Sequence, residues 1–154
     1  MEDIRQIQPM RHTRYQGAII QDDKILLIRH TDHADGRSYW VIPGGGREDG
    51  ETEEACVARE MWEETNLVVQ VERLLVEMAL PHDPFNKVRK SYLCTIIAGE
   101  AAPGYEPEED AAHYAITEVA WFDLRAEDHW EPSIFTNPIA YPVIQEIRRV
   151  LGYL

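Results

Sequence analysis

Three glutamates lie close together in the segment Arg59-Glu60-Met61-Trp62-Glu63-Glu64. Positions i, i+3 and i+4 fall on one face of an α-helix, so Glu60, Glu63 and Glu64 are expected to point the same way. Like charges at this spacing repel by roughly 0.2–0.5 kcal/mol per pair. A hard divalent cation such as Mg²⁺ or Mn²⁺ would turn that repulsion into binding, because it takes carboxylate oxygens as ligands. The alternative is a solvated acidic helix face, which the glutamates alone leave open.

A glycine-rich segment, Pro43-Gly44-Gly45-Gly46, precedes the acidic helix. Glycine has no side chain and tolerates positive φ, so this loop can pass close to a ligand. Asp49-Gly50 indicates a further turn, and Thr52 is placed to cap the helix, with acidic residues in its first turn. The helix is expected to end near Asn66, because asparagine accepts the left-handed conformation common at helix ends. The glycine loop favours a binding site over a merely solvated face.

A helical wheel divides the expected helix into two faces. Glu53 joins the clustered glutamates on one arc. The opposite arc carries Ala55, Ala58 and Trp62, with Met61 at its edge. This second arc is therefore expected to pack on the core, while the carboxylates line a cleft.

The residues and spacings resemble the signature of the Nudix hydrolase family. That signature is Gly, five residues, Glu, seven residues, Arg-Glu, an apolar residue, any residue, Glu-Glu, any residue, Gly and an apolar residue. The matching positions are Gly45, Glu51, Arg59, Glu60, Glu63 and Glu64, with Met61 and Leu67 at the apolar places. Asn66 stands where the family has glycine, and the turn is expected to survive, since asparagine is the usual substitute there. The resemblance covers residues 45–67 directly.

The resemblance implies a Mg²⁺- or Mn²⁺-dependent enzyme in which water attacks phosphorus and cleaves a nucleoside diphosphate linked to another moiety. By the same resemblance, Glu60 and Glu64 are metal ligands, and Glu63 is a ligand or a partner of a metal-bound water. The carbonyl of Gly44 is implied as a further ligand.

Two catalytic assignments also follow from the resemblance. Arg59 and Glu51 correspond to the family's internal ion pair, which would orient the helix. The general base is either a glutamate of the helix or an acidic residue of a later loop, residues 104–110, in which Glu109 is the candidate.

Other residues offer weaker possibilities for substrate binding. Arg29 and Arg89 are candidates to bind phosphate, with Arg37 and Lys90 in reserve, although basic residues beside strands are usually just solvated. Aromatic residues that could stack on a base are Tyr39, Trp40, Phe85 and Tyr92, although such residues are more often part of a core. His30 and His33 do not have the setting of a zinc site.

Composition fits a small enzyme of one domain, because 154 residues can bury a core without disulfides. The net charge is −13, from 15 basic and 28 acidic residues. This balance disfavours binding to duplex nucleic acid or anionic membranes, but not a small nucleotide, since a metal can bridge carboxylates to phosphates. No apolar leader or membrane span is evident, and two cysteines far apart suit a reducing compartment, so the cytoplasm is expected. A homodimer stays open, as does a non-catalytic, Nudix-like module that senses a nucleotide.

The remaining sequence indicates strands around this helix. Strands are expected over 14–21, 24–30, 39–42, 67–80, 91–98 and 116–122, and a helix over 141–151. A change in the alternation of apolar residues near Arg73 predicts a bulge or bend. Loops are expected over 31–38, 81–86 and 101–110. The expected fold is an α/β protein with a mixed sheet between helices, the α/β/α sandwich that the resemblance also implies.

Overall fold

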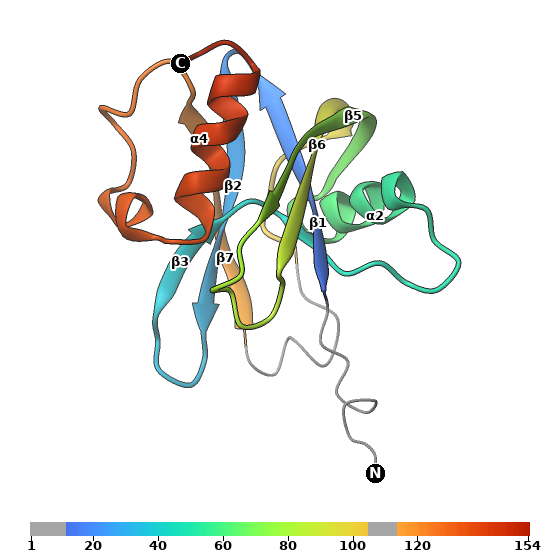
Figure 1. Cartoon of the computed structure of the whole chain (residues 1–154), viewed down its shortest axis with the longest axis horizontal. Helices are drawn as coiled ribbons and strands as arrows, with labels where there is room; N and C mark the ends of the chain where they lie inside the picture. Colours follow the sequence, from blue (N-terminus) through green and yellow to red (C-terminus); the bar gives the residue numbers. More distant parts are fainter. Residues whose placement is uncertain (1–11, 105–113) are drawn as a thin grey trace.

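The computed structural model describes residues 12–104 and 114–154. A mixed sheet lies between helices, which Figure 1 shows on opposite sides of it. The described elements are, in chain order, β1 (Thr13–Gln21), β2 (Lys24–Asp32), β3 (Ser38–Val41), β4 (Gly44–Gly45), α2 (Glu53–Thr65), β5 (Leu67–Ala79), β6 (Val88–Gly99), β7 (Tyr114–Asp123), the 3-10 helix η1 (Pro132–Thr136) and α4 (Ala140–Val150). The predicted α/β/α sandwich is confirmed.

The sheet follows the order β3-β2-β1-β6-β5, with β4 paired to β1 and β7 paired to β2. β1 and β6 run parallel, and the other pairs are antiparallel. β1 pairs with β2 only beside their hairpin, at Ile20↔Ile25 and Gln21↔Lys24. Beyond the hairpin, β4 pairs with β1 and β3 pairs with β2. At Tyr15 and Gln16, β1 therefore lies between β4 and β6.

Local signals explain several elements. Asp22 and Asp23 both have positive φ, 52° and 64°, which is the backbone of a tight hairpin turn. β5 and β6 pair with register shifts, one of them between Val71 and Arg73, so the bend predicted near Arg73 is confirmed. β2 continues to Asp32 and β3 begins at Ser38, which makes the loop expected over 31–38 shorter than predicted.

Two apolar clusters fill the two sides of the sheet. α4 buries Val143, Ile144 and Ile147 against one face, as its helical spacing predicts. α2 buries Cys56, Val57 and Met61 in the other cluster. Within the described parts of the chain, no helix is both long enough and apolar enough to cross a membrane.

α2 begins and ends where the sequence predicts. Oγ1 of Thr52 accepts a hydrogen bond from the backbone N–H of Ala55 at 3.1 Å, and Asn66 ends the helix with φ 64°. The left-handed asparagine thus serves in place of glycine.

Replacing Thr52 by alanine is expected to lower the free energy of unfolding by about 1 kcal/mol, because the cap acceptor is lost. Urea denaturation followed by far-UV circular dichroism measures this. Thr52→Ser is the matched control, since serine keeps the hydroxyl. Equal stability of the alanine and wild-type proteins would show that the cap contributes nothing.

Candidate active site

The glycine segment reaches the acidic helix through a two-residue strand. β4 was expected only as part of a loop, but Gly44 and Gly45 pair with Gln16 and Tyr15 of β1. The backbone N–H of Gly44 donates to Oε1 of Glu64 at 2.8 Å. This contact ties the loop directly to the last turn of α2.

Gly45 is required by space rather than by backbone conformation. A Cβ built on Gly45 would overlap Oε2 of Glu60 and lie 2.6 Å from its Cδ. Neither Gly44 nor Gly45 is among the residues with positive φ in the described chain. The glycine therefore makes room for the Glu60 carboxylate against the strand.

The buried face of α2 is the opposite of the predicted one. Trp62 is 54% exposed, and Ala55 is exposed as well. Glu60 and Glu64 are instead buried, beside the apolar residues Cys56, Val57 and Met61. The prediction was wrong because it assigned the core contact to the arc of Ala55, Ala58 and Trp62 and kept the carboxylates apart from the core. Here the carboxylates lie in the middle of the buried arc and face β4.

Arg59 connects the acidic residues around the helix. Its Nε donates to Oε2 of Glu51 at 2.7 Å, and its Nη2 donates to Oε1 of Glu51 at 3.0 Å. Its Nη1 lies 3.1 Å from Oε2 of Glu60 and 3.2 Å from Oε1 of Glu63. The ion pair that the family resemblance implies is thus present, and the same guanidinium also contacts two of the clustered glutamates.

The electrostatics of these groups follow from their partners. Hydrogen bonds from Arg59 lower the pKa of Glu51 to about 2, and the same pairing raises the pKa of Arg59. Burial raises the pKa of Glu60, although the charges of Arg59 and Arg14 act in the opposite direction. A buried carboxylate with a raised pKa is one that a further positive charge would stabilise.

The donor chemistry of the cluster fits a hard divalent cation, because Glu60, Glu63 and Glu64 offer carboxylate oxygens from one helix. As the described residues stand, no three acidic, histidine or cysteine side chains converge on a single point. Glu60 and Glu63 contact Arg59, and Glu64 contacts Gly44. In this arrangement the guanidinium of Arg59 neutralises part of the negative charge of Glu60 and Glu63.

Residues 102–104, called the strap below, pack on the C-terminal end of α2. The backbone N–H of Ala102 donates to the carbonyl of Thr65, and that of Gly104 donates to the carbonyl of Glu64, both at 3.0 Å. These bonds satisfy carbonyls that a helix end leaves without partners. The candidate base, Glu109, follows in the sequence and lies outside the described residues.

The two candidate phosphate-binding arginines lie in different settings. Arg29 is in β2, where it pairs with Glu118 of β7 at 3.1 Å and is 42% exposed. Arg89 is in β6 with only 11% of its side chain exposed, and it pairs with Asp83 at 2.8 Å. Arg14, which sequence reasoning did not select, lies directly across from Arg89 on β1. Only the register of two strands distant in sequence could have indicated it.

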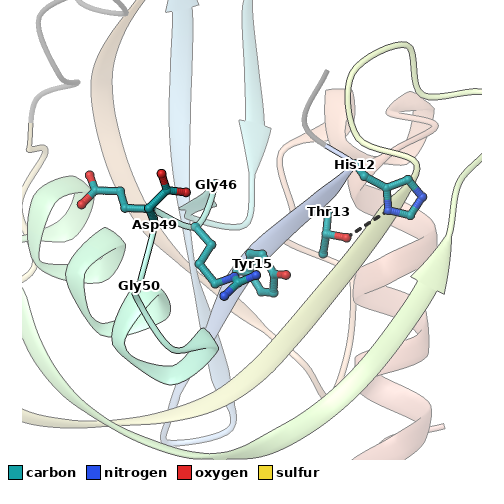
Figure 2. Close-up of a pocket in the computed structure, with 8 residues that line it drawn as sticks. His12, Thr13, Tyr15, Gly46, Asp49 and Gly50 are labelled. Carbon is teal, nitrogen blue, oxygen red and sulfur yellow. Dashed lines mark hydrogen bonds between the residues drawn. The ribbon is translucent and has the colours of Figure 1, made fainter. Parts of the chain in front are cut away.

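A cavity of about 450 Å³ adjoins the loop that follows β4. Figure 2 shows His12, Thr13 and Tyr15 on the β1 side and Gly46, Asp49 and Gly50 on the loop side. Arg47 and Glu48 complete the lining, which does not include the helix carboxylates.

Comparison with known proteins identifies relatives with the same domain. A family model described as the NUDIX domain matches residues 11–141. An ADP-ribose pyrophosphatase of Methanocaldococcus jannaschii is 37% identical over 95 residues, which cover 60% of this chain and 56% of that protein. An NAD-capped RNA hydrolase, NudC, of Vibrio vulnificus is 33% identical over 129 residues, covering 84% of this chain and 44% of that protein.

The chain spans 34% to 56% of the length of the first curated relatives it matches. A solved structure of a NUDIX hydrolase from Nitrosomonas europaea superposes with a TM-score of 0.66 at 25% identity, covering 91% of this chain and 69% of that one. The family match, the sandwich and the ion pair between Arg59 and Glu51 agree, and the chain belongs to the NUDIX family.

Proposed function

We propose that the protein is a metal-dependent hydrolase that cleaves a pyrophosphate bond in a nucleoside diphosphate linked to another moiety. The observation that carries this proposal is the burial of Glu60 and Glu64 against the glycine strand, beside the ion pair of Arg59 and Glu51. Burying carboxylates costs free energy, so a fold that places two of them there has a use for their charge.

Mg²⁺ or Mn²⁺, held by Glu60, Glu63 and Glu64 and by the carbonyl of Gly44, would cancel phosphate charge and lower the pKa of water. The protein's own residues hold and orient these groups. Arg59, fixed by Glu51, sets the position of the Glu60 and Glu63 carboxylates.

The proton of the attacking water goes to Glu63 or to an acidic residue of the loop after Gly104, with Glu109 as the candidate. Phosphoryl transfer depends mainly on such positioning and charge stabilisation, so no covalent nucleophile is needed.

The substrate belongs to the class of nucleotide sugars, ADP-ribose, dinucleoside polyphosphates or nucleoside triphosphates. Relatives named for ADP-ribose pyrophosphatase and for NAD-capped RNA hydrolase activity support a substrate with an internal diphosphate. Both names refer to compounds in which a nucleotide is joined through such a bridge.

The test is a panel of ADP-ribose, NADH, UDP-glucose, diadenosine tetraphosphate and dGTP, with products separated by anion-exchange chromatography. Turnover is expected with Mg²⁺ or Mn²⁺, and replacing the metal by EDTA is expected to lower it roughly 100-fold or more. Turnover of no compound on the panel, together with nucleotide binding, would favour the non-catalytic sensing module instead.

A further inference from the structure

Two arginines face each other across the parallel strands β1 and β6. Arg14 and Arg89 are register partners, and both donate to the same atom, Oε1 of Gln16, at 3.2 Å and 2.9 Å. Two guanidiniums that share one acceptor oxygen lie close together, and like charges at that separation repel. The arrangement is therefore costly unless something negative is bound nearby.

The described residues compensate this charge only in part. Nη2 of Arg89 donates to Oδ2 of Asp83 at 2.8 Å, and Nη2 of Arg14 donates to the carbonyl of Ile42 at 2.9 Å. Over residues 12–104 and 114–154, Arg14 has no ion pair, and the buried Nε of Arg89 has no hydrogen-bond partner. Burial and the charge of Arg14 together lower the pKa of Arg89 to about 10. Within the described residues, Arg89 therefore has a carboxylate partner and Arg14 has none.

The pair lies next to the candidate active site. Ile42, which Arg14 contacts, comes two residues before Gly44, and Gln16 is the register partner of Gly44 on β1. The charge of Arg14 also acts on Glu60. A phosphate chain bound beside the helix carboxylates would therefore have Arg14 as a neighbour.

Gln16 fixes the geometry of the two cations. It is buried, and its Nε2 donates to Oγ of Ser91, which is also buried, at 3.0 Å. Because that bond orients the amide, its oxygen is directed at both guanidiniums. Two guanidinium groups held in this way are suited to donate several hydrogen bonds each to phosphate oxygens.

We propose that Arg14 and Arg89 form an anion-binding site that holds a phosphate group of the substrate, with Gln16 as the positioning residue. This inference rests on the proposed function, because it names the residues that bind the phosphate chain of that same substrate. Because the chain carries a net charge of −13, a local positive site would help to attract an anionic substrate. The competing explanation is structural: the pair would merely join β1 to β6 and to the turn at Asp83.

The test measures binding of inorganic pyrophosphate to metal-free protein by isothermal titration calorimetry. Without metal the glutamates repel the probe, so binding reports on the arginines. Arg14→Gln and Arg89→Gln are each expected to weaken pyrophosphate binding about 10- to 100-fold, the range for hydrogen bonds to charged groups. Arg125→Gln is the matched control, because it removes the same charge from an exposed arginine paired with Asp123 at 2.9 Å.

Equal pyrophosphate affinity of wild type, Arg14→Gln and Arg89→Gln, each with a cooperative thermal transition, would overturn the proposal and leave the structural explanation. An equal loss of affinity in Arg125→Gln would overturn it as well, because the effect would then be one of net charge. If Arg89→Gln does not fold after losing its bond to Asp83, Arg14→Gln decides the question. Lack of turnover on the substrate panel would refute the hydrolase and not this site, since the probe is measured without catalysis.

Discussion

Glu64→Gln is expected to lower kcat about 100-fold or more on any compound that the protein turns over, while the fold is retained. Removing one electrostatic contribution to catalysis typically has an effect of this size. Glutamine keeps the oxygen that accepts the N–H of Gly44, so the strand and helix stay joined. What it lacks is the negative charge that would hold a divalent cation. Product release measured at saturating substrate with Mg²⁺ gives kcat directly.

The matched control for this variant is Glu54→Gln. Glu54 is an exposed residue in the first turn of the same helix, and it lies outside the carboxylate cluster. The Glu54→Gln substitution changes the net charge by the same amount as Glu64→Gln and is expected to leave kcat within about twofold. Comparable kcat values for Glu64→Gln and wild type would contradict the role assigned to the buried carboxylate.

Gly104→Ala is expected to destabilise the protein by about 3 kcal/mol, the upper end of the usual cost of overpacking, because the added methyl group would meet helix backbone. A Cβ at Gly104 would overlap the carbonyl oxygen of Glu63 and lie 2.7 Å from its carbonyl carbon. These are backbone atoms of the helix, so they cannot move aside as a side-chain tip does. The strap must instead leave the helix end and lose its bonds to Glu64 and Thr65.

Thermal unfolding measures the Gly104→Ala effect, which corresponds to a fall in Tm of roughly 6–12 °C for a chain of this size. Gly36→Ala is the control, because nothing lies within 4 Å of a Cβ there and only its φ of +71° carries a cost. That cost is about 1 kcal/mol. If the two variants lower Tm equally, the strap does not depend on close packing against α2.

The sequence could predict the acidic helix to within a residue, because its signals are local. Thr52 and Asn66 act on backbone groups within one turn of the helix. Both caps can therefore be recognised from the sequence without knowledge of the tertiary structure. The bend near Arg73 was predictable for the same reason, since a phase change in alternation is a property of consecutive residues.

The face that α2 buries could not be predicted from local signals. Charged residues ordinarily mark the solvent side of a helix, and Glu60 and Glu64 break that rule by lying among Cys56, Val57 and Met61. Exceptions of this kind are expected at functional sites, where a fold accepts a local cost. The pairing of Gly44 with Gln16 was equally hidden, because two glycines carry no strand signal.

The partnership of Arg14 with Arg89 depends on a strand register that no local pattern specifies. Of this pair, Arg89 was already a candidate because of its charge. Arg14 becomes a candidate only because the strand register places it beside Arg89. Their common partner, Gln16, reads in sequence as an ordinary polar residue of a strand. Its burial and its bond to Ser91 belong to the tertiary structure.

The parallel pairing of β1 with β6 also orders events during synthesis. Gln16 and Ser91 are 75 residues apart, so the loop between them must be translated before their strands can meet. Contacts across such separations are slow to form, because a long segment has to be closed first. A nascent chain that has emerged as far as Leu67 carries every residue of the acidic signature. It still lacks the strand that sets Arg89 beside Arg14, and the turn that supplies Asp83.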